Sequence, residues 1–476
     1  MEFEAVIGLE IHIELNTTTK LFCNCANHTD SPPNTNTCPT CLWFPGAVPL
    51  LSDMAVDKAA LVALGLGCEL QPESSFDQKV YYYPDLAKGY QLTQAQQPIA
   101  CGGYVEVTNE KGTPRKLRIH HIHLEEDVAK LIHEMEGRVK ISLVDFNRAG
   151  VPLIEIVTEP DIRTPHEAME MLKSLRNVVR SVGASECSLE SGSMRADANI
   201  SIRPKGTSEL NTKVEVKNMN SLRSVGDAIA FEIARQTAAV NGGEAITEHT
   251  RLWDADKKVT LPMRDKFDVP YIPEPTIGTV RLTPERIAHL RTLLPELPAA
   301  KADRLVKEYS LSNVEALFLS TDADAATYFE TLAGDGIAVK TAYHWLVTQL
   351  MPLLREQQFE VGDSPVMPSR LAQLLKLLTN DEINANAARE TLAVMFHSTK
   401  SPAQIVEEKG FRQLSDTTLI DSLIETVLQQ NQAAVADLQN GIGKAMGFLI
   451  GQVMQASDGK ANPKLIKERL SQKFNK

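Results

Sequence analysis

Residues 7–15 alternate strictly between apolar and polar positions, and this period of two is typical of a β-strand with two different faces. One face carries only Ile and Leu. The other face carries Gly8, Glu10, His12 and Glu14. A strand that buries one face and presents carboxylates and an imidazole on the other favours an antiparallel sheet covered by helices on one side only.

A second segment, residues 118–130, holds three histidines, three consecutive carboxylates and a lysine. Read as a strand, it places His121, His123 and Glu125 on one side, while Glu126 points to the other. Carboxylate oxygens and imidazole nitrogens are ligands of Mg²⁺ or another hard divalent ion. The alternative interpretation is a solvated strand end held by salt bridges.

Three further strands repeat this design, with an apolar back and a front of acids, amides and basic residues. They cover residues 153–159, with Glu155; residues 193–203, with Asp197, Asn199, Ser201 and Arg203; and residues 213–217, with Lys213, Glu215 and Lys217. A polar sheet face of this kind predicts an open active-site floor. Carboxylates there would hold Mg²⁺, and Arg and Lys would hold phosphate oxygens.

Four of the seven cysteines form the pattern Cys23-x-Cys25-x12-Cys38-x2-Cys41. Two short cysteine pairs separated by a loop indicate a structural four-cysteine zinc site rather than unrelated thiols. An odd cysteine count does not suit a full disulfide framework.

The aromatic segment 81–91 contains a Pro, a Gly and Lys88. It is either a packed turn or a loop that grips substrate, in which aromatic rings stack on bases and Lys88 meets phosphate.

Composition narrows the class of protein. Hydrophobic residues make up 43% and charged residues 23%, which is ordinary for a soluble globular protein. Without an apolar run of roughly 18 residues or a signal or transit peptide, we expect a cytoplasmic protein with no membrane span. A net charge of −12 argues against non-specific coating of nucleic acid. Because the sequence has neither a P-loop nor a dinucleotide-binding motif, any nucleotide must bind in another way.

Helices are expected at residues 52–66, from Thr164 to Gly183, and at 222–240. After a proline-rich stretch at 268–278 the sequence is mostly helical, and Ser401 begins a third unit. Its last helix, after Asn462, should turn Leu465, Ile466, Leu470 and Phe474 inward. The basic residues Lys464, Lys467, Arg469 and Lys473 then form either a solvated face or a phosphate-backbone contact.

Several strings in the chain resemble those of a known family. They are residues 7–15; Cys38-Pro-Thr-Cys41; residues 83–91; His123-Leu-Glu-Glu-Asp127; residues 145–156; residues 192–199; Lys217-Asn-Met-Asn-Ser221; Gly443-Lys-Ala-Met-Gly-Phe-Leu449; and Ala461-Asn-Pro463. In this order, and over essentially the whole chain, they resemble the GatB family of tRNA-dependent amidotransferases, in its bacterial three-subunit form.

The resemblance implies an α+β fold in three parts. A cradle-like catalytic (kinase/transamidase) domain at 1–290 would be built on an antiparallel sheet with flanking helices and carry the zinc loop 23–41. An all-α domain at 291–402 and an all-α, YqeY-like tail at 403–476 that binds tRNA would follow.

The resemblance also implies a reaction. The family transfers the γ-phosphate of ATP to the side-chain carboxylate of Glu-tRNA(Gln) or Asp-tRNA(Asn), and then displaces phosphate with ammonia. The ammonia comes from a glutaminase (amidase) A subunit, and a small C subunit completes the heterotrimer. Mg²⁺ would serve catalysis and Zn²⁺ would be structural.

Carried over onto this sequence, the resemblance assigns the following residues. Glu10, His12, Glu125, Glu126 and Glu155 would hold Mg²⁺, with Asp197, Asn199 and Lys217 completing the catalytic floor. Lys88, Arg148 and Arg195 would contact ATP phosphates, Cys23, Cys25, Cys38 and Cys41 would hold Zn²⁺, and Lys464, Lys467, Arg469 and Lys473 would contact tRNA. Either Glu125 or Glu126 could be the metal ligand, since neighbours on a strand face opposite ways.

The chain departs from the family pattern in three places: at His121, where the family has Arg; at Val128-Ala129; and across Val269–Thr276. Two other classes of protein fit parts of the sequence. A zinc-stabilised RNA-binding scaffold would present aromatic and basic residues on the sheet, not acids. A stand-alone ligase for a small carboxylic acid would not need the basic tail.

Overall fold

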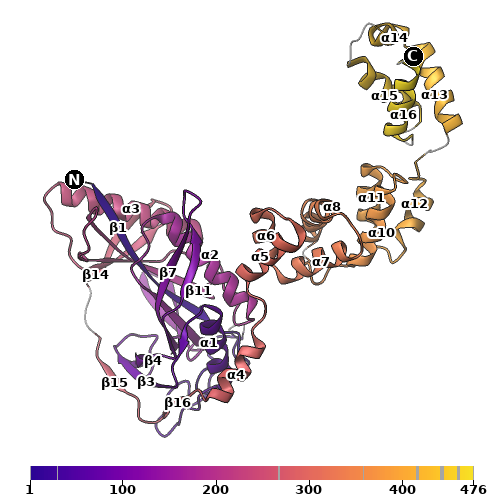
Figure 1. Ribbon diagram of the computed structural model, residues 1–476. Coiled ribbons are helices and arrows are strands. Elements are labelled where there is room, and N and C mark those ends of the chain that lie inside the picture. The colour runs from indigo at the N-terminus through magenta and orange to yellow at the C-terminus, as the bar shows by residue number, and fades with distance from the viewer. Residues whose placement is uncertain are drawn as a thin grey trace. The chain divides into compact units, whose positions relative to one another are not determined.

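The computed structural model of the chain describes residues 2–28, 31–265, 269–357, 359–413, 417–439, 444–457 and 461–474 (Figure 1). Asp268 and Gly443, which belong to strings named above, lie outside the described residues. The chain divides into two compact units, Met1–Ala300 and Lys301–Lys476. The first unit combines a large sheet with helices and the second is helical, which confirms the predicted α+β class.

The main sheet of the first unit has the strand order β14-β13-β12-β11-β1-β10-β7-β4-β3-β15. Its strands are β1 (Phe3–Glu14), β3 (Glu73–Val80), β4 (Tyr90–Gln97), β7 (Pro114–Glu126), β10 (Pro152–Thr158), β11 (Met194–Pro204), β12 (Val214–Lys217), β13 (His249–Asp254), β14 (Val259–Asp265) and β15 (Tyr271–Pro273). The short strands β2 (Glu69–Leu70), β5 (Ala100–Cys101), β6 (Tyr104–Thr108) and β16 (Val280–Arg281) pair off this path.

The sheet is antiparallel, as predicted, except where β12 pairs with β13 in parallel. The reason is the connection between these two strands, which contains α3 (Leu222–Asn241). Parallel neighbours need a crossover of this length, whereas a tight turn joins antiparallel ones.

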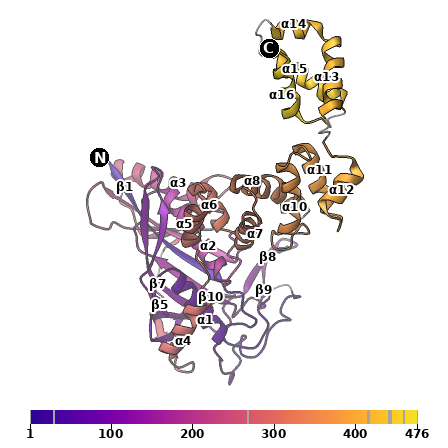
Figure 2. The ribbon, with the colours of Figure 1, turned by 45° about the vertical axis from the view of Figure 1, so that its right-hand side comes forward.

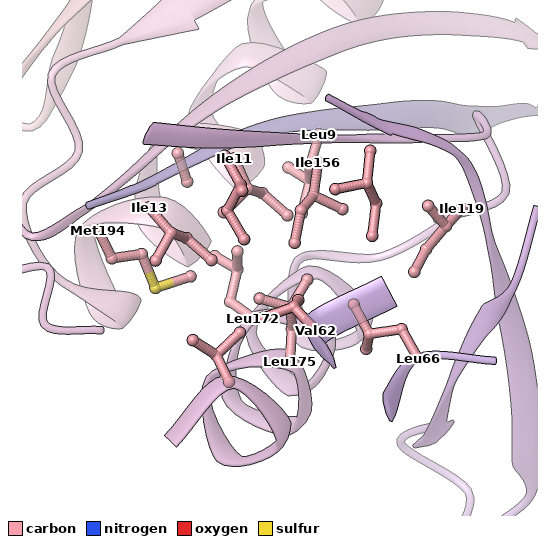
Figure 3. Packing of buried hydrophobic residues seen from close by; sticks show 14 of the residues in the cluster. Leu9, Ile11, Ile13, Val62, Leu66, Ile119, Ile156, Leu172, Leu175 and Met194 are labelled. Atoms are coloured by element: carbon pink, nitrogen blue, oxygen red, sulfur yellow. The ribbon is translucent and has the colours of Figure 1, made fainter. Parts of the chain in front are cut away.

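The apolar face of β1 packs against two helices, α1 (Asp53–Gly65) and α2 (Pro165–Ser181). Figure 3 shows Leu9, Ile11 and Ile13 above Val62, Leu172 and Leu175 in this core. All six side chains are fully buried or nearly so. Because the helices cover this face, the polar residues between the apolar positions of β1 point to the other side of the sheet.

The three predicted helix starts are confirmed by their caps. The side chains of Ser52, Thr164 and Ser221 accept hydrogen bonds from the first-turn backbone of α1, α2 and α3. Such caps satisfy backbone donors that have no partner inside the helix. Pro165 occupies the first turn of α2, where its missing N–H leaves no helical bond unmade.

A separate two-stranded ribbon, β8 (Lys130–Glu136) with β9 (Val139–Asp145), lies beside the main sheet (Figure 2). Its base is fixed to the cysteine loop through Asn34. The backbone N–H of Asn34 donates to Asp145 Oδ1 at 2.9 Å, and its amide donates to the carbonyl of Val144 at 2.9 Å.

The remaining helices are α4 (Pro284–Leu293), α5 (Pro298–Tyr309), α6 (Asn313–Ser320), α7 (Ala323–Gly334), α8 (Val339–Trp345), the π-helical turn η1 (Leu346–Leu350), α9 (Met351–Glu356), α10 (Pro368–Thr379), α11 (Ala385–Met395), α12 (Pro402–Lys409), α13 (Thr417–Gln430), α14 (Gln432–Gln439), α15 (Lys444–Ala456) and α16 (Pro463–Phe474). Two cores lie within the second unit. One joins buried residues between Leu305 and Val406, and the other joins residues between Ile420 and Leu470. On this basis we keep the three predicted domains, with boundaries at 290/291 and 402/403, as a proposal.

In α16, Ile466 and Leu470 are buried, and Leu465 and Phe474 pack beside them, as predicted. Among the described helices, none combines the length and the apolar composition needed to cross a bilayer.

Candidate functional site

The register of the sheet aligns polar residues from four strands in rows, because residues directly opposite each other share one face. In the central row His123 of β7 faces Glu155 of β10, Glu155 faces His12 of β1, and His12 faces Arg195 of β11. In a neighbouring row Glu10 of β1 faces Asp197 of β11. Residues from distant parts of the chain are thereby brought together on one side of the sheet.

This face forms the floor of a cavity of about 750 Å³. The predicted site residues that line it are Glu10, His12, Glu125, Glu155, Arg195, Asp197 and Lys217. Its other lining residues are Lys79, Tyr81, Gln91, Asp127, Val128, Leu153, Glu215, Thr250, Arg264, Val269 and Tyr271. Charged groups of both signs dominate, so the cavity suits a polar, anionic substrate together with a cation.

At the centre of the floor two imidazoles alternate with two carboxylates. Glu155 Oε2 lies 3.3 Å from His12 Nε2 and 3.2 Å from His123 Nε2. Glu125 Oε2 lies 4.0 Å and 3.6 Å from the same two nitrogens, and Glu125 Oε1 lies 3.7 Å from Lys79 Nζ. We call His12, His123, Glu125 and Glu155 the acid–imidazole cluster.

The cluster fits a divalent cation by the chemistry of its donors. His12, Glu125 and Glu155 each offer one ligand atom, and these atoms lie within 4.8 Å of one another. Glu125 Oε2 is buried and makes no hydrogen bond within the described part of the chain. A buried carboxylate oxygen without such a bond is unfavourable unless a further group satisfies it.

Burial and charge shift the ionisation of the cluster. Burial alone lowers the pKa of His12 and of His123, but the adjacent carboxylates, Glu155 first and then Glu125, together outweigh it. The pKa of His12 is therefore raised, and that of His123 is raised to about 9. Burial alone raises the pKa of Glu155, but His12 and His123 together hold it well below its usual value. Glu155 is thus a carboxylate at neutral pH.

A second group adjoins the cluster on β1, β11 and β12. Asn199 donates to Glu10 Oε1 at 2.9 Å, and Lys217 is paired with Asp197 and, at 3.1 Å, with Glu215. Burial, followed by the charges of Glu155 and Glu215, raises the pKa of Glu10. Asn199 does not itself line the cavity; it orients Glu10.

A third group surrounds the buried carboxylate of Asp127. Arg195 donates to Asp127 Oδ2 at 2.7 Å, and Arg148 Nε lies 3.6 Å from the same oxygen. Arg148 also donates to the carbonyls of Val128 and Ala129, each at 2.9 Å. Of these two arginines only Arg195 lines the cavity, whereas Arg148 holds the loop that follows β7.

Glu126 and Lys88 lie apart from the cavity lining and pair with each other. Glu126 Oε1 also accepts from the backbone N–H of Leu92 at 2.8 Å. The Lys88 ammonium lies 4.1 Å from the ring centre of Trp43 and 5.1 Å from that of Tyr90, so it is held by a carboxylate and two aromatic faces. The structure therefore separates Glu126 and Lys88 from the residues with which they were predicted to act.

The four clustered cysteines converge on one point. The Sγ atoms of Cys23, Cys25, Cys38 and Cys41 all lie within 4.8 Å of one another, a limit that includes the roughly 3.8 Å separation that tetrahedral zinc–sulfur bonds imply. The backbone N–H of Cys38 lies 3.1 Å from Cys41 Sγ, and the buried Lys20 ammonium lies 3.8 Å from it. The hydrogen bond between Cys23 and Cys41 is the largest cause of both their shifts: it lowers the pKa of the Cys41 thiol to about 5 and raises that of Cys23. The convergence of four sulfur atoms on one point lets the cluster hold a metal ion.

The basic residues of α16 are mostly paired with acids of the same unit. Lys464 Nζ lies 2.9 Å from Asp381 Oδ1, Arg469 lies 3.5 Å from Asp421, and Lys473 pairs with Glu425. Lys467 is exposed and forms no ion pair within the described residues. A phosphate contact at the three paired positions would require the acids to be displaced.

The sequence-based prediction missed lining residues from β3 and from the edge of the sheet, notably Lys79, Tyr271 and Arg264. A signal for Lys79 was present in the sequence: Asp77, Lys79 and Tyr81 stand at every second position at the end of β3, which places their side chains on one face of the strand. Arg264 and Tyr271 flank residues 266–268, and their position depends on which strands become neighbours, for which the sequence carries no local signal.

Comparisons with known proteins assign a family. A family model described as the GatB/GatE catalytic domain matches residues 5–288, and one described as the GatB domain matches residues 327–474. A protein of Syntrophus aciditrophicus, named as B subunit 1 of aspartyl/glutamyl-tRNA(Asn/Gln) amidotransferase, is 62% identical over 475 residues. That match covers 100% of this chain and 99% of the relative.

Two further relatives are named as the B subunit of aspartyl/glutamyl-tRNA(Asn/Gln) amidotransferase. The protein of Persephonella marina is 43% identical over 476 residues, with 99% of each chain covered. That of Carboxydothermus hydrogenoformans is 42% identical over 481 residues, with 100% of this chain and 99% of the relative covered.

Proposed function

The chain belongs to the GatB family, and we propose that it is the B component of a tRNA-dependent amidotransferase, a carbon–nitrogen ligase that uses glutamine as amide donor. Its substrates are glutamate esterified to glutamine tRNA, aspartate esterified to asparagine tRNA, or both. Because the proposed substrate is an aminoacyl-tRNA, we place the reaction in the cytoplasm.

The observation that carries this proposal is the acid–imidazole cluster on the floor of the charged cavity. A side-chain carboxylate is a poor electrophile until one of its oxygens becomes part of a leaving group. Activation by ATP requires that two anions, a phosphate and a carboxylate, be held together against their repulsion. A site with clustered metal-binding acids and several cationic side chains meets this requirement.

Mg²⁺ would be held by Glu125, Glu155 and His12, with Glu10 beside them. When bound, it supplies charge neutralisation for the phosphates of ATP. We place Glu126 outside this ligand set, because its carboxylate is already engaged by Lys88 and the Leu92 backbone.

The cationic side chains of the cavity orient the two anions. We assign this task to Lys79, Arg195 and Lys217, since all three line the cavity, whereas Lys88 and Arg148 do not. Each is paired with an acid, so a bound phosphate shares the cation with Glu125, Asp127 or Asp197. These pairs keep the cations in place before substrate binds.

The reaction has two steps. An oxygen of the substrate carboxylate attacks the γ-phosphorus of ATP, and the bond to ADP breaks, leaving an acyl phosphate. Ammonia then attacks the carbonyl carbon, the bond to phosphate breaks, and nitrogen loses a proton to give the amide. During both steps the hydrogen bond from Asn199 orients Glu10 on the cavity floor, and the Arg148 contacts hold the loop that follows β7.

We propose that ammonia arrives from a glutaminase A subunit and that a small C subunit completes the complex, as the resemblance implies. The tail at 403–476 contacts tRNA, with Lys467 as the basic residue of α16 best placed to do so. The four-cysteine cluster holds a structural Zn²⁺ that fixes the loop carrying Trp43 against Lys88.

Reconstitution tests the proposal. The chain is combined with its A and C partners, ATP, Mg²⁺, glutamine and either Glu-tRNA(Gln) or Asp-tRNA(Asn), and the esterified amino acid is identified after hydrolysis. We expect conversion to glutamine or asparagine that depends on both ATP and this chain. No conversion of either tRNA in a well-formed complex would contradict the assignment.

A further inference from the structure

His123 is the one member of the acid–imidazole cluster that does not line the cavity. Its side chain is 7% exposed and lies behind the two carboxylates. Its Nε2 is 3.2 Å from Glu155 Oε2 and 3.6 Å from Glu125 Oε2, so one nitrogen faces both acids. These distances allow His123 to orient Glu125 on β7 and Glu155 on β10 together, as His12 can from the cavity side.

The second ring nitrogen of His123, Nδ1, is buried and makes no hydrogen bond within the described part of the chain. What fixes the ring is the imidazole of His121, which stacks on it with a centroid separation of 5.1 Å and an interplanar angle of 20°. The orientation of His123 therefore depends on a stacking contact rather than on a second hydrogen bond.

The backbone places His121 for this contact through a β-bulge. Val157 of β10 faces His121, but the next residue, Thr158, faces Ile119, so β7 contains one extra residue, His120. A bulge changes the direction of the side chains beside it. Here it brings the Nδ1 atoms of His120 and His121 to 2.6 Å, which fixes the outer ring.

We propose that His123 is a positioning residue for the divalent-cation site, and that His121 supports it by stacking. This inference rests on the proposed cation site of Glu125, Glu155 and His12. Groups that contact the metal ligands from behind set the direction of the ligand oxygens, and their loss typically weakens metal binding about 10–100-fold.

Two pairs of variants of the full chain test the proposal. His123→Leu removes the nitrogen that faces the carboxylates, whereas His123→Gln retains an amide nitrogen at nearly the same distance from the backbone. His121→Ala removes the stacked ring, and His121→Phe replaces it with another aromatic ring. The probe is Mn²⁺ alone, whose free concentration is followed by electron paramagnetic resonance, and thermal unfolding controls for folding.

We expect His123→Leu to weaken Mn²⁺ binding about 10–100-fold, with most of the affinity restored in His123→Gln. His121→Ala should weaken binding by a smaller factor, and His121→Phe should bind like the wild type. In the assembled enzyme, the Mg²⁺ concentration for half-maximal rate should rise in the same order, while the KM for tRNA stays unchanged.

Equal Mn²⁺ affinity in wild type, His123→Leu and His121→Ala would overturn the inference, as would loss of affinity in His123→Gln equal to that in His123→Leu. If His123→Leu does not fold, the comparison of Mn²⁺ affinity between His121→Ala and His121→Phe decides whether the inference holds. A different result would show that the cation site itself is wrongly assigned: the wild type would then bind Mn²⁺ no better than Glu125→Gln does.

Discussion

Glu125 and Glu126 are consecutive residues of β7 whose carboxylates have different partners on different sides of the strand. Glu125 faces His123 and Lys79 on the cavity floor, whereas Glu126 pairs with Lys88 and accepts from the Leu92 backbone. The separation follows from the alternation of a β-strand, and it assigns the two acids different tasks.

Exchanging each acid for its amide should therefore have different effects. Glu125→Gln removes a cluster carboxylate, and we expect kcat for tRNA amidation to fall on the order of 100-fold or more, with tRNA affinity retained. Steady-state kinetics with tRNA as the varied substrate separates the two quantities.

Glu126→Gln should instead affect stability. It leaves the buried Lys88 ammonium without its carboxylate, which costs about 3 kcal/mol of unfolding free energy. Its kcat per folded molecule should stay close to that of the wild type. A stable Glu126→Gln protein with abolished kcat would show that the two roles are reversed.

Glu232 of α3 is predicted to be a pH-dependent stabiliser of the first unit. It is fully buried and accepts from Arg235 at 2.6 Å, from Gln236 at 3.0 Å and from Thr260 at 2.9 Å. Burial alone raises its pKa, but these hydrogen bonds outweigh burial and lower the pKa below the usual value near 4.5. Its stabilisation is thus complete above about pH 4.5 and is lost as the pH falls through the lowered value.

The test is urea unfolding of the wild type and Glu232→Gln at several pH values. We expect the variant to be less stable by about 3 kcal/mol at pH 7, because Arg235 and Arg251 lose their carboxylate. The difference should shrink below about pH 4.5. A difference that is constant from pH 7 to pH 3 would rule out the ionised carboxylate as its source.

The cysteine cluster should bind one zinc ion per chain, measurable by elemental analysis of the purified protein. Cys41→Ser should lose the metal and lower the melting temperature, because the loop then keeps only contacts such as Asn34 with Asp145. Turnover per folded molecule should change little. Full metal content in Cys41→Ser, or lost turnover in a stably folded variant, would argue against a structural zinc site.

The tail should bind tRNA through Lys467, which forms no ion pair among the residues that the structure describes. Lys467→Ala is expected to weaken tRNA binding and to reduce the slope of log K against log salt by about 1. Lys464→Ala serves as the matched control, and it should have a smaller effect because Lys464 is paired with Asp381. Asp381→Asn should strengthen binding by releasing that lysine. The opposite ranking of the two lysines would place the contact elsewhere on the tail.

The strands and the residues of the cavity floor could be predicted from the sequence, because each depends on the pattern of residues within a single segment. The alternation in β1, β10 and β11 predicted which side chains point away from the core, and the structure brings Glu10, His12, Glu155 and Asp197 together on that side. The helix starts at Ser52 and Thr164 could be predicted for the same reason, since each depends on one capping side chain next to its helix.

What depends on strand order and register could not be derived in this way. Lys79 reaches Glu125 only because β3, β4 and β7 are neighbours, and no single segment encodes that order. The bulge at His120 depends on how β7 pairs with β10. The contacts of Lys88 with Glu126 and Trp43 could not be derived from the sequence either, because these two partners come from distant segments.

Transfer of phosphate to the substrate carboxylate within this cavity is the step on which the proposed reaction depends. Glutamate labelled with ¹⁸O in its side-chain carboxylate is charged onto glutamine tRNA and converted by the assembled enzyme, and the released inorganic phosphate is analysed by mass spectrometry. We expect one ¹⁸O atom to be transferred to each phosphate, together with formation of ADP. Phosphate without ¹⁸O, or label appearing in AMP, would show that the carboxylate is not activated in this way.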